Sequence, residues 1–171
     1  VIVGLLEKDQ VVRYDDGHKE LRFVHDLYGE WAIIEMLERD YKVCKSIDAV
    51  YQKYKDTVMG RRCFRQWLGE HLLHNNEIGD GISDILKQED ESELQEEVMS
   101  AILQSDNCHA YLNKNLSMLT GNGMKILYKL LFWLPVSCVF ISKDELFSSS
   151  SVNVVPNGKS WETLIDIVYQ L

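Results

Sequence analysis

Between residues 46 and 134, apolar residues recur at helical spacing, and only short polar turns interrupt them. Residues 92–95 fit a capping box, in which Ser92 and Gln95 would satisfy free backbone groups at the start of a helix. The apolar residues that follow share one helical face: Leu94, Val98, Ala101 and Ile102. The chain has only two prolines in 171 residues, so few positions force a helix to break. This pattern predicts a mainly α-helical chain.

We expect helices near residues 46–56, 60–75, 80–88, 92–105, 106–117, 122–134 and 158–170. The helix near 122–134 is apolar nearly all round, which predicts a central position, and Pro135 is expected to end it. A second capping pattern stands at residues 142–145, and the serine run 148–151 predicts a flexible loop. Successive helices favour a stack of helical pairs, although no repeat of fixed length is visible.

The N-terminal part has a different pattern, which predicts a β-hairpin. Residues 11–14 are typical of a short strand, and residues 21–24 are typical of the strand that returns beside it. The Asp-Asp-Gly-His sequence between them predicts a turn, because Gly17 can adopt a positive φ angle. The chain starts at Val1 in the middle of an apolar run, without methionine, and residues 1–7 are typical of the end of a helix. We therefore expect the chain to be a piece of a longer polypeptide.

An amphipathic helix is expected at residues 26–41, directly after the hairpin. Four of its residues fall on one line of the helix surface: Leu27, Trp31, Ile34 and Glu38. A helix end, a hairpin and a second helix follow one another in the wing and exit of a winged-helix domain. We expect residues 1–41 to be the C-terminal part of such a domain, and residues 42–171 to be an α-helical linker or repeat module.

The most specific motif is the run Arg-Phe-Val-His-Asp-Leu-Tyr-Gly-Glu-Trp-Ala at residues 22–32. It resembles the Met-His-Asp motif of plant disease-resistance proteins and related signalling ATPases of the STAND class. In that class the pair follows the wing hairpin and opens a helix; Val24 stands here where plant members have methionine. The resemblance implies that His25 reaches the β-phosphate of bound ADP and that Asp26 orients the imidazole.

The physical chemistry of this position is compatible with that role. A residue at a helix N-terminus lies where free N–H groups and the helix dipole favour an anion. An imidazole N–H can donate to a phosphate, and an adjacent carboxylate can fix its tautomer. A plainer alternative stays open, in which Asp26 caps the helix and His25 packs beside the hairpin.

Three downstream segments extend the resemblance, because bacterial members of the class carry similar segments in the same order. Here they read Phe-Arg-Gln-Trp-Leu at 64–68, Glu-Val-Met-Ser-Ala-Ile-Leu-Gln-Ser at 97–105 and Trp-Glu-Thr-Leu-Ile at 161–165. Each is a core pattern of low specificity, and the order carries the comparison. Only the motif at 22–32 implies a functional role.

The resemblance implies a regulatory fragment of a nucleotide-switch signalling ATPase, whose signal transduction would serve antiviral defence in bacteria. An upstream ATPase core of the same polypeptide would hold most of the ADP or ATP. Further partners would be a protein trigger and other copies of the protein, which form a homo-oligomer on activation. The main alternative is a winged-helix transcription regulator with a helical ligand or dimerisation domain, and a third is a purely structural helical scaffold.

The distribution of charged and apolar residues indicates whether nucleic acid or a membrane could be a partner. The net charge is −9, and residues 77–106 hold ten acidic residues against one base. Such a chain is a poor candidate for binding nucleic acid, because phosphate neutralisation dominates that affinity. The longest apolar run, 130–141, has 12 residues, whereas a membrane span needs roughly 20. Four widely spaced cysteines, Cys44, Cys63, Cys108 and Cys138, are typical of buried free thiols in the reducing cytoplasm.

We expect neither catalytic nor metal-binding residues in this chain. Residues 158–160, Gly-Lys-Ser, resemble the end of a phosphate loop, but Asn153 stands where that motif needs glycine, so a helix start is expected instead. His71 and His74 lie three residues apart, without the pattern of a zinc protease or a third ligand. The tryptophans are interpreted as core residues: Trp31, Trp67, Trp133 and Trp161. Without a phosphate loop, the chain is expected not to be an enzyme on its own.

Overall fold

The computed structural model describes residues 9, 11–15, 20–23, 25–89, 92–141, 154–156 and 158–171, and the chain is mainly helical, as predicted. The helices follow one another as α2 (Asp26–Cys44), α3 (Ile47–Tyr54), α4 (Val58–His71), α5 (Asn76–Lys87), α6 (Glu93–Gln104), α7 (Cys108–Lys114), α8 (Leu116–Thr120), α9 (Lys125–Ser137) and α10 (Lys159–Gln170). A short turn of 3₁₀ helix, η1 (Asn122–Met124), precedes α9. No helix in this described part is long and apolar enough to cross a membrane.

Side chains from the polar turns start several of these helices. Ser46, Thr57, Asn75 and Ser92 each accept a hydrogen bond from a backbone N–H in the first turn of the helix that follows. These caps satisfy groups that the helix itself leaves free, and each contributes about 1 kcal/mol to helix stability. The expected serine cap of α6 is therefore confirmed.

Two expectations about helix ends are wrong. The helix expected near 106–117 is interrupted at Asn115, where α7 ends and α8 begins. Helix α9 does not end at Pro135 but continues to Ser137. Proline lacks a backbone N–H, so in the last turn the helix loses only one hydrogen bond and can continue for two more residues.

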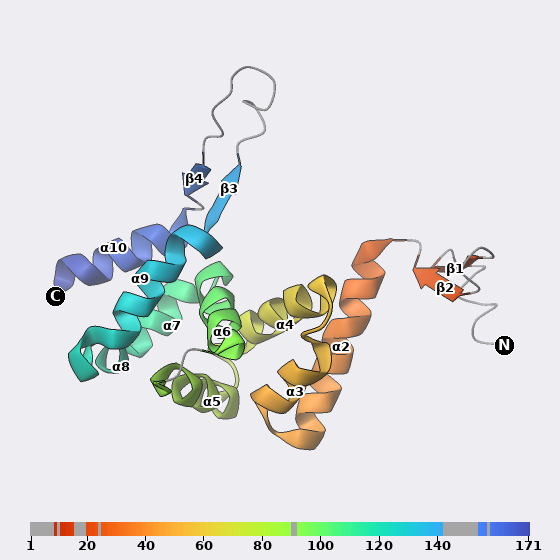
Figure 1. Cartoon of the computed structure of the whole chain (residues 1–171), viewed down its shortest axis with the longest axis horizontal. Coiled ribbons are helices and arrows are strands. Elements are labelled where there is room, and N and C mark those ends of the chain that lie inside the picture. Colours follow the sequence, from red (N-terminus) through yellow and green to blue (C-terminus); the bar gives the residue numbers. More distant parts are fainter. Residues whose placement is uncertain are drawn as a thin grey trace, which may run out of the picture.

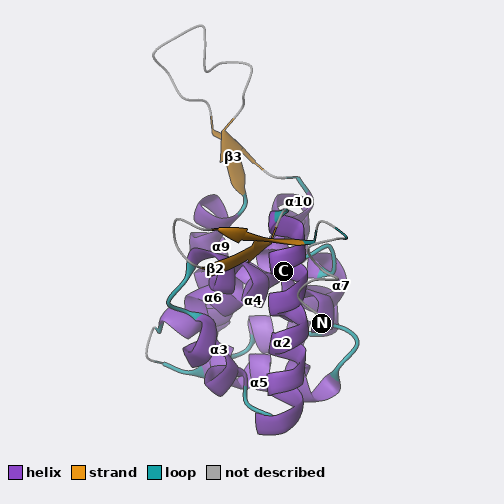
Figure 2. Cartoon of the chain, turned by 90° about the vertical axis from the view of Figure 1, so that its right-hand side faces the viewer, coloured by secondary structure: helices purple, strands orange, loops and turns teal. Residues whose placement is uncertain are grey.

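The predicted hairpin is present. Strands β1 (Val12–Asp15) and β2 (Glu20–Phe23) pair antiparallel, with Val12 opposite Phe23 and Asp15 opposite Glu20. Figure 2 shows this hairpin at the N-terminal end of α2. The expected helix end at residues 1–7, and most of the expected turn between the strands, lie outside the described residues.

A second hairpin was not predicted. Strands β3 (Val139–Ile141) and β4 (Val154–Pro156) pair antiparallel, with Phe140 opposite Val155. The segment 130–141 was interpreted as one apolar run, yet its last three residues form a strand. The capping pattern at 142–145 and the serine run 148–151 lie outside the described residues.

The helices pack in a row, and one continuous core connects them. Helix α2 packs against α4, α4 against α6, and α6 against α9, so the row runs from α2 at one end to α9 and α10 at the other (Figure 1). The core extends from Leu37 in α2 through Trp67 and Leu68 in α4 to Ile167 in α10. The helices from α2 to α10 are therefore joined by packed side chains of one core.

The expectation that the tryptophans are buried is correct only in part. Trp67 is fully buried, with 0% of its surface exposed, whereas Trp31 is 65% exposed. Trp133 and Trp161 are partly buried against the core. The face of α2 that packs inward carries Leu37 and Tyr41, which lie about 80–120° around the helix from Trp31 by the helical repeat. The apolar character of Leu27 and Trp31 had indicated the wrong face.

Two glycines with opposite surroundings give a test of this packing. A Cβ atom added to Gly60, near the start of α4, would overlap the backbone carbonyl oxygen of Tyr54. We expect Gly60→Ala to lower the free energy of unfolding by about 1–3 kcal/mol, because the backbone must shift. At Gly79, within α5, the nearest atom would be 4.0 Å away. Gly79→Ala should therefore raise stability by about 0.5–1 kcal/mol. Urea unfolding of both variants would check this pair, and equal effects would contradict the packing around Gly60.

Candidate functional site

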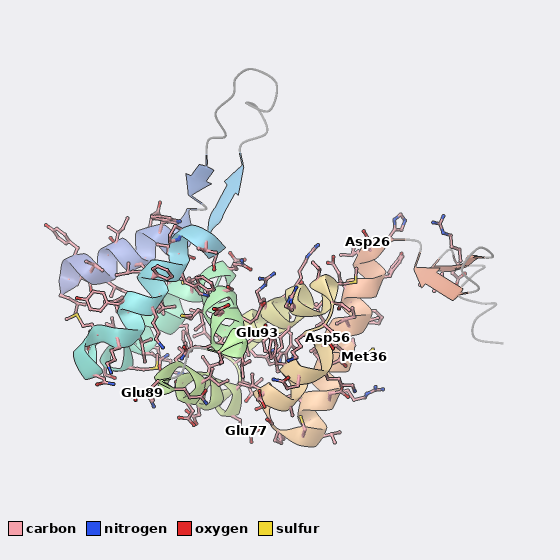
Figure 3. All side chains as sticks on the ribbon, viewed as in Figure 1. Asp26, Met36, Asp56, Glu77, Glu89 and Glu93 are labelled. Carbon is pink, nitrogen blue, oxygen red and sulfur yellow. The ribbon has the colours of Figure 1, made fainter. Side chains whose placement is uncertain are left out.

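His25 and Asp26 lie at the start of α2, and His25 is two positions after the last residue of strand β2. His25 is the residue that precedes the first helical turn, and its backbone is extended, with φ −123° and ψ 138°. Its carbonyl oxygen accepts a hydrogen bond of 3.1 Å from the backbone N–H of Tyr28. Asp26 is the first helical residue, and Figure 3 shows it at the end of α2 that lies nearest to the hairpin. The two predicted site residues are therefore neighbours on one exposed helix end.

Both side chains are exposed to solvent. The His25 side chain does not cap the helix, and with the residues that the structure describes neither side chain forms a hydrogen bond or ion pair. Asp26 is also not the capping residue, because His25 occupies that position. The His25 ring lies 5.9 Å from the Tyr28 ring, measured between centroids. The alternative in which Asp26 caps α2 thus does not describe this geometry.

An exposed helix end can supply only part of a phosphate site. It offers one imidazole and the free N–H groups of the first helical turn, which point along the helix axis toward an approaching anion. A tightly held phosphate also needs charged or polar donors on its other sides. The pair can therefore complete a nucleotide site whose remaining groups come from another element, but it cannot form one alone.

Apolar side chains surround the pair on the same helical turns. Leu27 is 72% exposed, and Tyr28 and Trp31 are also exposed. Isolated exposed apolar residues are ordinary, but three within two turns form a patch of the kind that marks a contact surface. The end of α2 therefore presents a polar pair with an apolar patch beside it.

The motif also ties α2 to the helical row. Glu30, within the motif, is buried, and its Oε1 lies 2.8 Å from Nη2 of Arg62 in α4. The thiol of Cys63 lies 3.8 Å from the carbonyl oxygen of Glu30, to which it donates a weak hydrogen bond. Sequence reasoning noted the acidic residue of the motif but not its partner. The ion pair joins the segment that carries His25 to the middle of the fold.

A second cluster holds α2 against α4 about two turns further along the helix. Glu38 Oε2 accepts hydrogen bonds from Nε1 of Trp67, at 2.9 Å, and lies 3.2 Å from Nε2 of His71. The Trp67 N–H holds the pKa of the Glu38 carboxyl below its usual value, and the charges of Lys42 and His71 act in the same direction. Sequence reasoning missed this cluster, because Glu38 and Trp67 are 29 residues apart. Its role is to lock α2 against α4.

The Gly-Lys-Ser segment at 158–160 and the two histidines, for which the sequence predicts no catalytic or metal-binding role, take part in packing or lie on the surface. Ser160 is buried and donates to the carbonyl oxygen of Leu103, and Gly158 directly precedes α10, so the predicted helix start at 158–160 is confirmed. His71 bonds to Glu38, whereas His74 is exposed. In the described ranges, no three His, Cys, Asp or Glu side chains gather into a group that could hold a metal ion.

The cysteines are free, and three of the four are buried. Burial raises the pKa of the Cys108 thiol to about 11, and it also raises the pKa of Cys63 and Cys138. These three thiols therefore stay protonated and unreactive at neutral pH. Cys44 is exposed, which corrects the expectation that all four are buried. Its position near the end of α2 gives it no partner in the core.

Comparison with known proteins adds no assignment: no protein-family model matches this chain, and no curated protein matches it.

Proposed function

We propose that this chain is the regulatory segment of a nucleotide-switch signalling ATPase, and that His25 and Asp26 sense bound ADP. Residues 1–41 would be the last part of a winged-helix domain, and residues 42–171 a helical module that relays the nucleotide state. The protein would act in the cytoplasm, respond to a protein trigger, and form a homo-oligomer once activated. Antiviral defence is the process that the resemblance suggests.

The observation that carries the proposal is the geometry at the start of α2. A hairpin is followed by an exposed histidine, which occupies the position just before α2, and by an exposed aspartate, which is the first residue of that helix. This is the arrangement that the Met-His-Asp resemblance requires, and the exposed imidazole is free to meet a phosphate from outside the helix. The upstream ATPase core would supply the remaining phosphate contacts and hold most of the ADP or ATP.

The fold offers a physical route from this pair to the rest of the chain. Glu30 lies one turn from His25 and pairs with Arg62, and Glu38 bonds to Trp67. Both contacts connect α2 to α4, and α4 packs on α6. A displacement of α2 on loss of ADP would therefore shift the whole row of helices. Packed side chains of this kind can carry coupling between distant sites.

Nucleotide extraction tests the proposal. We expect the full-length protein, purified without added nucleotide, to release close to one ADP per polypeptide when it is denatured and its supernatant is chromatographed. A full-length protein that carries no nucleotide, and that instead binds duplex DNA at submicromolar concentration with strong dependence on salt, would point to the transcription regulator.

The 171-residue chain alone should not hydrolyse ATP. We propose that it lacks the phosphate loop, the metal-binding acid and the base that phosphoryl transfer needs. A phosphate-release assay with Mg²⁺ and ATP should give the rate of buffer alone. Turnover that depends on protein concentration, and that disappears in a variant changed within this chain, would contradict this part of the proposal.

A further inference from the structure

Helix α9 carries an apolar stripe that points away from the core. Tyr128, Phe132 and Val136 follow one another at four-residue spacing, and they are 63%, 76% and 63% exposed. Residues at this spacing lie on one face of a helix, so the three side chains form a continuous ridge about 12 Å long. A ridge of large exposed apolar side chains differs from the scattered apolar residues of an ordinary surface. It marks an interaction surface.

A groove runs along one side of this ridge, between α9 and α6. It is a hollow of about 230 Å³, and its walls include Met99, Tyr128, Phe132 and Trp133. Figure 1 shows α9 beside α6, and Gln95, Glu96 and Met99 of α6 line the groove, so it lies on the α6 side of the ridge. Its size suits one or two aliphatic side chains from a partner rather than a whole small-molecule ligand.

The walls of the groove are held in place by hydrogen bonds. The Trp133 indole N–H donates to the backbone carbonyl oxygen of Glu96 at 3.0 Å, and the Phe132 and Trp133 rings stack at 6.3 Å with an angle of 8°. Beneath them, the buried amide of Gln95 donates to the carbonyl oxygens of Ile85, Leu86 and Gln88. A surface fixed in this way loses little conformational entropy when a partner binds.

The rim of the groove on the α6 side is acidic. Glu96 lines the groove and is exposed, and Glu93, one turn earlier in α6, is exposed too. Glu97 of α6 pairs with Arg61 and Arg65, and Glu89 pairs with Lys125, whereas Glu93 and Glu96 have no cationic partner among the described residues. The amine of Lys129, which also borders the groove, already donates to Oε1 of Gln95 at 2.9 Å. The rim therefore favours a partner that carries positive charge.

We propose that this groove binds a basic amphipathic helix of a partner protein. Aliphatic side chains at positions i, i+4 and i+7 of that helix would pack against Phe132 and Trp133, and its lysines or arginines would lie opposite Glu93 and Glu96. This is the helix-in-groove mode of recognition, in which apolar anchors supply affinity and the flanking charges set orientation. The proposal does not depend on whether His25 senses ADP.

Fluorescence polarisation with defined peptides tests this proposal. The probe is a fluorescein-labelled helical peptide of about 18 residues, with leucines on one face and lysines on the flanks. We expect saturable binding to the 171-residue chain at physiological salt, and Phe132→Ala should weaken it at least about tenfold. Tyr169→Ala is the matched control, because Tyr169 is 91% exposed on α10, away from the groove. It should change binding less than about twofold.

Reversing the charge of the two rim residues distinguishes binding in this groove from a general attraction of basic peptides to an acidic protein. Glu93→Lys/Glu96→Lys should weaken the leucine–lysine peptide at least about tenfold and should strengthen a leucine–glutamate peptide of the same length. Circular dichroism checks that the variants fold. No saturable binding, equal loss in Phe132→Ala and Tyr169→Ala, or concentration-dependent self-association that Phe132→Ala abolishes would each overturn the proposal. The last result would instead assign the groove to a second copy of the chain.

Discussion

Replacing Trp67 by alanine is expected to lower the free energy of unfolding by about 3–5 kcal/mol. Trp67 is fully buried where α2, α4 and the core meet, and its ring contacts those of Tyr41 and Phe64 at centroid distances of 5.4 and 6.0 Å. The substitution leaves a large cavity and also removes the hydrogen bond to Glu38. The loss of that donor leaves a partly buried carboxylate oxygen with one partner fewer, which adds to the cost.

Trp31→Ala is the matched control for this change. Trp31 is 65% exposed on α2, so its removal should alter stability by less than about 1 kcal/mol. Urea unfolding followed by circular dichroism measures both variants on the same scale, without relying on tryptophan fluorescence. Similar losses in the two variants would mean that α2 packs through the Leu27 and Trp31 face, which contradicts the structure.

The second large effect is expected at His25 in the full-length protein. If His25 donates to the phosphate of ADP, the lost charge-assisted hydrogen bond is worth about 1.5–3 kcal/mol. His25→Ala should therefore weaken ADP retention by roughly ten- to a hundredfold. His74→Ala is the control, because His74 is also an exposed histidine but follows α4 rather than opening α2. The dissociation rate of labelled ADP from wild type and from both variants gives the comparison.

The direction of the effect on signalling follows from the state that the contact stabilises. Because ADP holds the resting state in this proposal, His25→Ala and Asp26→Val should raise activity in the absence of the trigger. A purely structural pair predicts the opposite, a general loss of stability and of all activity. A His25→Ala protein that keeps its ADP and its dependence on the trigger would show that the pair does not sense nucleotide.

Local features of the fold were predictable, because they depend on residues close in sequence. The cap of α6 is one example: Ser92 accepts from the backbone N–H of Gln95 at 3.2 Å, as the capping pattern predicts. The other half of that pattern was wrong. The Gln95 side chain does not turn back to Ser92 but bonds to carbonyl groups at the end of α5, with Lys129 of α9 as a further partner. The position of α5 and α9 around α6 decided this choice, and no short pattern encodes it.

Tertiary features were predicted less well. The inward face of α2 is set by where α4 packs, so Leu27 and Trp31 could not be distinguished from core residues by spacing alone. Strand β3 was not predicted, because its three residues end a continuous apolar run. So short a segment shows no alternation of apolar and polar residues that would distinguish a strand from a helix. In both cases the apolar pattern showed that residues could be buried, but not which neighbours would bury them.

In the candidate site, too, local features were predictable and contacts between helices were not. The position of His25 and Asp26 after a hairpin and at the start of a helix was predictable, because both the hairpin and the helix start depend on residues close in sequence. The contacts that anchor their helix were not, because Glu30 and Arg62 lie on different helices and each alone is an ordinary surface residue type. A charged residue within an apolar face, as Glu30 is, was the available signal. Its partner could come only from the fold.

The structure of the ADP-bound full-length protein tests the central claim most directly, through one distance. We predict that a ring nitrogen of His25 lies about 2.7–3.2 Å from an oxygen of the ADP β-phosphate, with the Asp26 carboxylate beside the imidazole. A bound ADP whose β-phosphate is surrounded entirely by other residues, with His25 beyond hydrogen-bonding distance, would contradict it.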